Sequence, residues 1–228
     1  MKRLVRPELL DTLSPEDPRA VHSRRDLRRI NWWMRNHVIM ARVLGKNLTA
    51  APERITELGA GDGHFLLRLA KEMSARWRRV DATLLDLQDN FSAPTLASLR
   101  ALGWHPEAVV ADVFAWSPPG DAGSVFVANL FLHHFDDAQL SRLLQKVSQN
   151  TQLFVAIEPH RFTAPWLVGQ LLWLIGCNGV TRHDAVASIR AGFAGVEISA
   201  RWPDQSNWQL TEHRAGWFSH LFVARRRE

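Results

Sequence analysis

The sequence predicts an α/β fold: a doubly wound, mostly parallel sheet of seven strands with an antiparallel C-terminal hairpin and an N-terminal helical cap. From Ile55 onward, short apolar runs alternate with segments of helical periodicity, a pattern typical of βαβ units. The last apolar runs follow one another with no helix between them, which favours antiparallel pairing at the edge of the sheet. Residues 1–48 precede this alternation and have helical spacing, so they are expected to form the cap.

Five short apolar runs, each bounded by polar or turn residues, are expected to form the parallel strands: 54–58, 82–85, 108–111, 125–128 and 152–157. Such runs indicate strands that are buried under helices on both faces of a sheet. The C-terminal strands are expected over 196–202, 208–210 and 218–223.

Apolar side chains at helical spacing predict crossover helices after the first and the fourth strand. The first helix would contain Phe65, Leu66, Leu69, Ala70 and Met73, and the second Leu140, Leu143, Leu144 and Val147 after a start at Asp136 and Asp137. Near the N-terminus, Ser23 with an acidic residue at Asp26 fits a helix start that leads into Leu27, Ile30, Trp33 and Met34.

We expect two parts of the chain: a helical cap over 1–50 and a main domain over 51–228 with an apolar lid inserted around 160–180. The stretch 164–175 is almost wholly apolar. Crossing a bilayer takes about 20 such residues, so the stretch is too short for a membrane span. An apolar stretch of this kind is still compatible with peripheral contact with a membrane.

Composition and charge limit the class of protein. The chain has 228 residues, of which 46% are hydrophobic and 22% charged, values typical of a globular protein. A single cysteine, Cys177, excludes an internal disulfide framework, and the basic N-terminus runs into Glu8 without an apolar signal segment. These features favour the cytoplasm. The formal charge of +5 is compatible with a nucleic-acid partner. The arginines are spread along the chain and do not form one basic patch, which argues against such a partner.

A glycine-rich loop follows the first predicted strand. Gly59, Gly61 and Gly63 allow a sharp turn and bring bare backbone close to a ligand. A dinucleotide-binding loop would require a further glycine where His64 stands, and a phosphate-binding Walker loop would require a lysine followed by serine or threonine. The loop therefore favours a nucleoside ligand without phosphate.

Acidic residues at the predicted strand ends fit S-adenosylmethionine, which carries a sulfonium and an amino group but no phosphate. Glu57 precedes the loop, and Asp86, at the end of the second strand, is placed to accept from ribose hydroxyls. Asp112, after the third strand, is the candidate for the adenine amino group, with apolar neighbours to flank the ring.

These landmarks, followed by Asn129 and Leu130 after the fourth strand, resemble the class I S-adenosylmethionine-dependent methyltransferase superfamily over residues 50 to 160. The resemblance implies a Rossmann-like methyltransferase fold, S-adenosylhomocysteine as a product, and the following cofactor-binding residues: Glu57, Gly59, Ala60, Gly61, Gly63, Asp86, Leu87, Asp112, Val113, Asn129 and Leu130. Arg29 or Asn31 is expected to engage the carboxylate end of the cofactor.

Two adjacent histidines, His133 and His134, are the candidate catalytic residues. They follow the fourth strand, at the sheet edge where ligands of open α/β folds bind. The surrounding segment is similar to that of phenolic O-methyltransferases in which a histidine acts as base, and this implies that role for His133. The acid that directly follows the histidine in that family is His134 here, so the group that orients the base is not identified. No metal is expected, because adjacent side chains point apart and no third ligand is evident.

More widely, residues 7–11, 26–31, 129–135 and 158–161 resemble bacterial small-molecule methyltransferases found beside type III polyketide synthases. This implies O-methylation of an alkylated phenol or quinol, such as an alkylresorcinol, by a monomer or a homodimer. The candidate pocket residues are Trp33, Glu158, Trp166 and His220.

Other functions stay open. One is C- or N-methylation of another small molecule. An RNA or protein methyltransferase is favoured by the arginines but not by the residues at 129–132, which lack the Pro-Pro-aromatic pattern of enzymes that hold a planar nitrogen. A cofactor-binding scaffold that no longer turns over is the non-enzymatic alternative.

Overall fold

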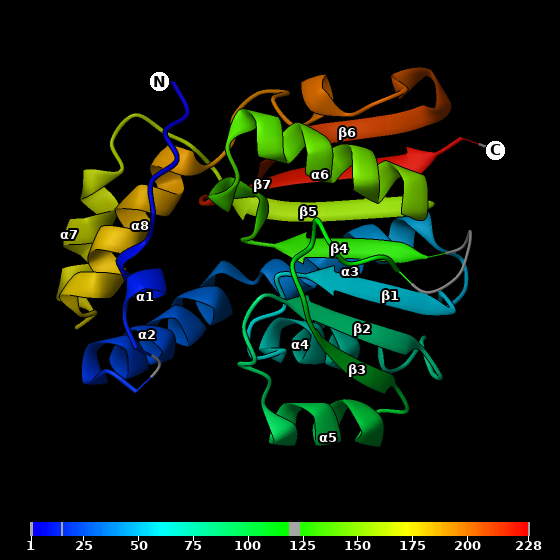
Figure 1. Ribbon diagram of the computed structural model, residues 1–228, viewed down its shortest axis with the longest axis horizontal. Coiled ribbons are helices and arrows are strands. Elements are labelled where there is room, and N and C mark those ends of the chain that lie inside the picture. Colours follow the sequence, from blue (N-terminus) through cyan, green and yellow to red (C-terminus); the bar gives the residue numbers. More distant parts are fainter. Residues whose placement is uncertain (1, 15, 119–123, 228) are drawn as a thin grey trace.

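The computed structural model describes residues 2–14, 16–118 and 124–227 (Figure 1). Three helices come first: α1 (Leu9–Thr12), α2 (Pro18–Met34) and α3 (Asn36–Asn47). The alternating core follows, with β1 (Arg54–Leu58), α4 (His64–Met73), β2 (Asp81–Asp86), α5 (Ala93–Ala101), β3 (His105–Val110), β4 (Val125–Asn129), the short 3-10 helix η1 (Leu132–His134), α6 (Asp137–Asn150) and β5 (Leu153–Pro159). The last part contains α7 (Trp166–Leu174), α8 (Gly179–Ala191), η2 (Ser199–Arg201), η3 (Gln205–Asn207), β6 (Trp208–Ala215) and β7 (Ser219–Arg226).

The seven strands form one sheet in the order β3-β2-β1-β4-β5-β7-β6. Strands β1 to β5 pair parallel, whereas β7 pairs antiparallel with both β5 and β6. The predicted doubly wound, mostly parallel sheet with an antiparallel C-terminal hairpin is therefore confirmed. Because β1, β2, β4 and β5 run in one direction, the residues that follow them meet at one edge of the sheet.

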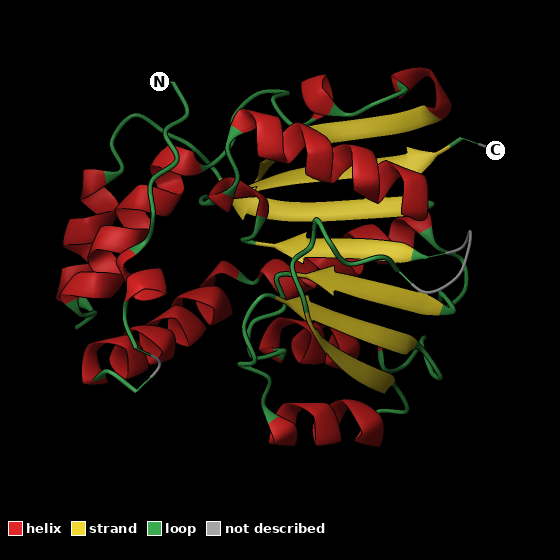
Figure 2. Ribbon diagram, viewed as in Figure 1, coloured by secondary structure: helices red, strands yellow, loops and turns green. Residues whose placement is uncertain are grey.

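Side chains alternate between two hydrophobic layers along the central strands. Val125, Val127 and Val155 face the layer that contains α3, α4 and α5, while Phe126 and Phe154 face α6. Figure 2 shows the sheet between these helical layers. Every residue of β4 and β5 is buried, which explains why their sequences are continuously apolar instead of alternating.

Two local expectations are wrong. The second helix begins at Pro18, capped by the side chain of Asp17, and Ser23 lies inside it with its hydroxyl against Thr181. Residues 196–202 form turns and the helix η2, not a strand. Ile198 and Trp202 are apolar there because both are buried in the core, and not because they belong to the sheet. The expected helix start at Asp136 is confirmed, since its side chain accepts from the Gln139 amide in a capping box.

Helices α1, α2, α7 and α8 gather beyond the carboxyl ends of the strands (Figure 1). Helix α8 contacts α1, α2, α7, β5 and η1, and in Figure 1 it lies between α7 and the sheet. Helix α3 packs on the sheet instead, where Met40 and Leu44 are fully buried. The division of the chain at residue 50 and the lid around 160–180 stay predictions. Within the described part of the chain, no helix is long and apolar enough to cross a membrane.

Candidate active site

The glycine loop joins β1 to α4 and is held by the end of β2. The amides of Gly59 and Ala60 donate to the Leu85 carbonyl at 2.9 and 3.0 Å, and the Gly61 amide donates to Asp86 Oδ2 at 2.8 Å. All three glycines have positive φ, +71° at Gly59, +54° at Gly61 and +76° at Gly63. Residues other than glycine adopt this conformation at a cost, so the backbone itself requires these glycines.

Only Gly61 offers space for a ligand directly against its Cα. A side chain at Gly59 would overlap the Phe131 ring, and one at Gly63 would lie 2.7 Å from Leu84. At Gly61 none of the described atoms lies within 4 Å of the position that a Cβ would take. The sequence predicted that all three glycines lie against a ligand. Of the three, only Gly61 has open space at that position, while Gly59 and Gly63 allow close packing of the chain.

Glu57 has a buried carboxyl oxygen that a bound ligand could contact. Its side chain is buried at the end of β1, and its Oε2 has no hydrogen-bond partner among the described residues. Burial, together with the charges of Asp62 and Asp86, raises the pKa of Glu57 well above its usual value. A buried carboxyl oxygen without a partner is costly, and a ligand that brings a positive charge or a donor would relieve that cost.

The other predicted cofactor residues line the same edge. Asp86 also accepts from the Gln88 amide, and Asp112 accepts from the Phe114 amide in an exposed turn. Leu87 is 70% exposed, Val113 is half-buried against the α6 side of the core, and Ala60 is buried. These positions leave free oxygen lone pairs beside apolar surface, which suits a nucleoside.

The residues after β4 are fixed by hydrogen bonds. Asn36 donates to Asn129 Oδ1 at 2.8 Å and accepts from the Ser219 hydroxyl at 2.7 Å. Leu130 has φ of +54°, and its amide donates to the Ile157 carbonyl. This turn directs the chain into η1 at the edge of the sheet.

Glu158 is the residue that orients His133. Its carboxylate accepts from the amides of Phe131, Leu132 and His133, so it holds η1 in place. Its Oε2 also lies 2.8 Å from His133 Nδ1, and both side chains are buried. The sequence predicts a pocket position for Glu158 but no partner for the histidine.

Glu8 faces the other ring nitrogen of His133. Its Oε1 lies 3.6 Å from His133 Nε2, and it also accepts a short hydrogen bond from Ser188 of α8. Burial alone would lower the pKa of His133, but pairing with Glu158 and Glu8 outweighs it and raises that pKa to about 9. Burial would raise the pKa of Glu8, and the contact with His133 instead lowers it to about 2. At neutral pH a protonated His133 therefore lies between the side chains of Glu8 and Glu158.

The two histidine rings lie side by side, with centroids 4.3 Å apart. Burial and the charge of His133 lower the pKa of His134 to about 4. Because its side chain is exposed, we attribute the shift mainly to the charge. Glu8, His133 and His134 bring one possible ligand atom each within 4.8 Å of one another. The two histidines therefore do not point apart, and Glu8 is a possible third ligand, so neither argument against a metal applies. The absence of a metal stays a prediction.

The comparisons with known proteins agree with this geometry. Residues 55–152 match the family model described as a methyltransferase domain. Residues 55–152 therefore carry a methyltransferase domain, within a Rossmann-like methyltransferase fold. No curated protein matches this sequence.

Solved structures show the same fold. The plantazolicin methyltransferase BpumL, in complex with SAH, superposes with a TM-score of 0.68 at 12% identity, over 93% of this chain and 92% of that one. The pyocyanin biosynthetic protein PhzM has a TM-score of 0.60 at 17% identity, over 97% and 62%. A putative O-methyltransferase from Nostoc punctiforme has a TM-score of 0.61 at 16% identity, over 93% and 62%. The chain thus spans less than two thirds of the length of the last two, and at these identities the likeness concerns the fold.

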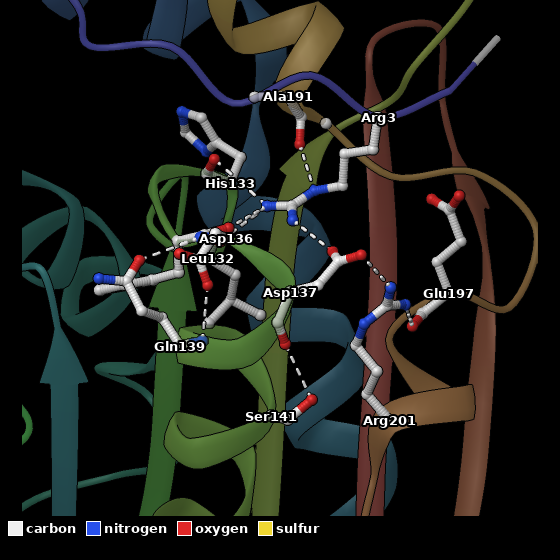
Figure 3. A network of polar contacts seen from close by, with 12 residues as sticks. Arg3, Leu132, His133, Asp136, Asp137, Gln139, Ser141, Ala191, Glu197 and Arg201 are labelled. Atoms are coloured by element: carbon white, nitrogen blue, oxygen red, sulfur yellow. Dashed lines mark hydrogen bonds and ion pairs between the residues drawn. The ribbon is translucent and has the colours of Figure 1, made fainter.

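Arg3 holds the N-terminal segment of the protein beside the site (Figure 3). Its guanidinium donates to the Ala191, Leu132, His133 and Phe135 carbonyls and pairs with Asp137 at 3.1 Å. The amides of Leu9 and Leu10 donate to Asp184 on α8. These contacts position Glu8, a functional candidate that sequence reasoning missed because its partner is distant in the chain.

Other predicted site residues make their contacts with groups away from His133. His220, on β7, lies opposite Glu158 in the strand pairing but contacts Glu212 at 2.8 Å. Arg29 donates to the Ile175 carbonyl, and Asn31 Oδ1 is buried with no partner among the described residues. Trp33 and Trp166 are 63% and 60% exposed. A surface hollow lined by Arg54 and His105 lies at the amino ends of the strands, so it belongs to the opposite edge.

Proposed function

We propose that this methyltransferase transfers the methyl group of S-adenosylmethionine to a hydroxyl of a hydrophobic small molecule, a phenol or quinol of the alkylresorcinol type. One observation carries the proposal: a buried histidine, His133, lies between two carboxyl groups at the carboxyl edge of the sheet, two residues after Phe131, whose ring lies against Gly59 of the glycine loop. A hydroxyl acceptor must lose a proton during transfer, and a positioned imidazole is suited to take it.

The cofactor is proposed to lie against Gly61. Asp86 would take the ribose hydroxyls and Asp112 the adenine amino group, while Glu57 would supply its unpartnered oxygen to the positively charged end of the cofactor. Arg29 or Asn31 would bind the cofactor's carboxylate. When bound, S-adenosylmethionine supplies a methyl group that is already activated by the positive sulfur. The protein then has to align the acceptor and exclude water.

The proton has a defined path in this arrangement. In its unprotonated form, His133 would accept the proton of the acceptor hydroxyl at Nε2 as the hydroxyl oxygen takes the methyl group, and S-adenosylhomocysteine would be the other product. Glu158 accepts from Nδ1 throughout and so fixes the ring and its tautomer. Glu8 stabilises the imidazolium that results. Because the pKa of His133 is raised to about 9, the base form increases toward alkaline pH.

An aromatic cluster supports an aromatic, apolar acceptor. Phe131 lies over Gly59 and stacks edge-on against Phe135 at 5.0 Å, and Phe114 packs against Phe135 at 5.5 Å. The similar structures include proteins described as an O-methyltransferase and a pyocyanin biosynthetic protein, both consistent with small-molecule acceptors. We also propose kinship with methyltransferases found beside type III polyketide synthases, which rests on the sequence motifs alone.

Transfer of a labelled methyl group to a panel of alkylresorcinols, quinols and simple phenols tests the function. His133→Ala should lower the rate by roughly 10² to 10⁴, the contribution typical of general acid–base catalysis. The matched control is His105→Ala, an exposed histidine that pairs with Asp81 at the opposite edge. Full activity of His133→Ala at neutral pH would refute the base, and calorimetry that detects no binding of S-adenosylhomocysteine would refute the enzyme.

A further inference from the structure

Helix α7 presents a large apolar surface to solvent. Its sequence, Trp-Leu-Val-Gly-Gln-Leu-Leu-Trp-Leu, contains no charged residue, yet only Leu172 is buried. Five large apolar side chains are exposed, with fractions between 47% and 73%: Trp166, Leu167, Leu171, Trp173 and Leu174. We call these five residues the α7 surface. The exposed Gln170 is the one polar residue on the same side of the helix. Exposed apolar surface of this extent marks an interaction site more often than ordinary protein surface does.

The α7 surface lies on one side of the helix, away from its support. The opposite side packs on α8: Leu172 is buried, and a methyl group at Gly169 would lie 3.3 Å from Val186 of α8. At about 100° per residue, the exposed positions from 166 to 174 span an arc of roughly 160°. The helix is thus fixed by one face while the wide apolar face has no partner among the described residues.

A strongly basic helix borders the α7 surface. Helix α2 contains five arginines and a single acidic residue, Asp26, which is buried. Arg19, Arg28 and Arg29 pair with Asp17, Asp62 and Asp26, so part of this positive charge is neutralised. The side chain of Arg29 donates to the Ile175 carbonyl at the end of α7, and the carbonyl of Arg19 accepts from Asn178 in the next turn. The apolar face and the positive charge are therefore adjacent.

We propose that the α7 surface docks on the surface of an anionic lipid bilayer. Tryptophan favours the boundary between headgroups and acyl chains, leucine inserts below it, and arginine attracts anionic headgroups. Nine residues are too few to cross a bilayer but sufficient for a helix that lies in its surface. Docking on a second copy through this face would instead bring two basic α2 helices together, which charge repulsion opposes. Such docking would give the enzyme access to acceptors dissolved in lipid.

Sedimentation with vesicles tests the proposal on the full-length protein. Wild-type protein should bind vesicles that contain phosphatidylglycerol more tightly than vesicles of phosphatidylcholine alone, and the difference should shrink with salt. The triple variant Leu167→Gln, Leu171→Gln and Leu174→Gln should bind the anionic vesicles at least tenfold more weakly. Arg25→Gln should weaken binding about fivefold, equivalent to about 1 kcal/mol for one basic residue near an anionic surface.

The control variant is Val196→Gln, which removes an exposed apolar side chain outside α7 and should bind as wild type does. Wild-type protein that stays in the supernatant with both kinds of vesicle overturns the proposal, as does a triple variant that binds unchanged. Light scattering that shows a dimer, lost in the triple variant, would assign the surface to a second copy instead. Vesicle binding requires no methyl acceptor, so its failure is distinct from a failure of the proposed function.

Discussion

Replacing Glu8 by glutamine should reduce the pH dependence of stability that His133 imposes. The pKa of His133 is about 9 in the folded protein against a usual value of 6.5. Folding therefore favours the protonated ring. The stabilisation is complete below pH 6.5 and is lost as the pH rises through 9, by about 3 kcal/mol at 1.36 kcal/mol per pKa unit.

The geometry divides this stabilisation between the two carboxylates. Glu158 lies 2.8 Å from Nδ1, and Glu8 lies 3.6 Å from Nε2. The more distant carboxylate should contribute less than half, on the order of 1 kcal/mol, because attraction falls with distance. Between pH 6.5 and 9, the free energy of unfolding should fall by about 3 kcal/mol in the wild type and by about 2 kcal/mol in Glu8→Gln.

Urea denaturation at several pH values across this window measures both slopes. Glutamine keeps the size of the side chain and can still accept from Ser188, so the variant removes mainly charge. Glu16→Gln serves as the control, since Glu16 is exposed and lies in the same segment. If Glu8→Gln loses as much stability as the wild type over this window, Glu8 does not pair with a charged His133 and the reasoning fails.

Three further predictions concern the cofactor loop. Asp86→Ala removes the acceptor of the Gly61 amide; hydrogen bonds to charged groups contribute about 1.5–3 kcal/mol, so calorimetry should show S-adenosylhomocysteine binding roughly 10- to 100-fold more weakly. Gly61→Ala meets open space and should cost only backbone strain of about 1–2 kcal/mol, whereas Gly59→Ala also overlaps Phe131 and should melt at a lower temperature. Glu57→Gln, which replaces a buried carboxyl of raised pKa by a neutral group of equal size, should keep the unfolding free energy within about 1 kcal/mol and weaken cofactor binding.

Each of these has a contrary outcome. Asp81→Ala removes an exposed carboxylate from the other end of β2 and should leave binding unchanged; equal affinities for it and Asp86→Ala would contradict the anchoring of the loop. A Gly61→Ala protein that melts below Gly59→Ala would show that the open space is not there. Wild-type affinity in Glu57→Gln would remove Glu57 from the cofactor site.

The fold was predictable because its signals are local. The run 54–58 coincides with β1, and the Asp136 cap starts α6 as expected, since both depend on neighbouring residues. The prediction of a strand over residues 196–202 failed for a physical reason. Ile198 and Trp202 lie in a loop but bury their side chains, and the Glu212 carboxylate accepts from the amides of Ile198 and Ser199 in place of a neighbouring strand. Burial without a strand ladder gives the same apolar pattern as a strand.

The candidate site was predictable only where topology places residues. Asp86 and Glu158 follow from the rule that parallel strands end at one edge, and the glycines follow from the turn after β1. The partner of His133 at Nε2 could not be inferred, because Glu8 is far from it in the chain and no local pattern links the two. The exposure of α7 was equally hidden, since its apolar sequence also fits a buried helix.

The pairing of His133 has a consequence for how such enzymes diversify. The segment that matches the methyltransferase family spans 55–152 and includes His133, but Glu8 and Glu158 both lie outside it. A protein with this core but without the two carboxyl groups would lack the contacts that raise the pKa of His133. The basicity of this histidine is thus set by flanking sequence that can change while the core stays intact. Two proteins that share this core can therefore differ in the pKa of the histidine at this position.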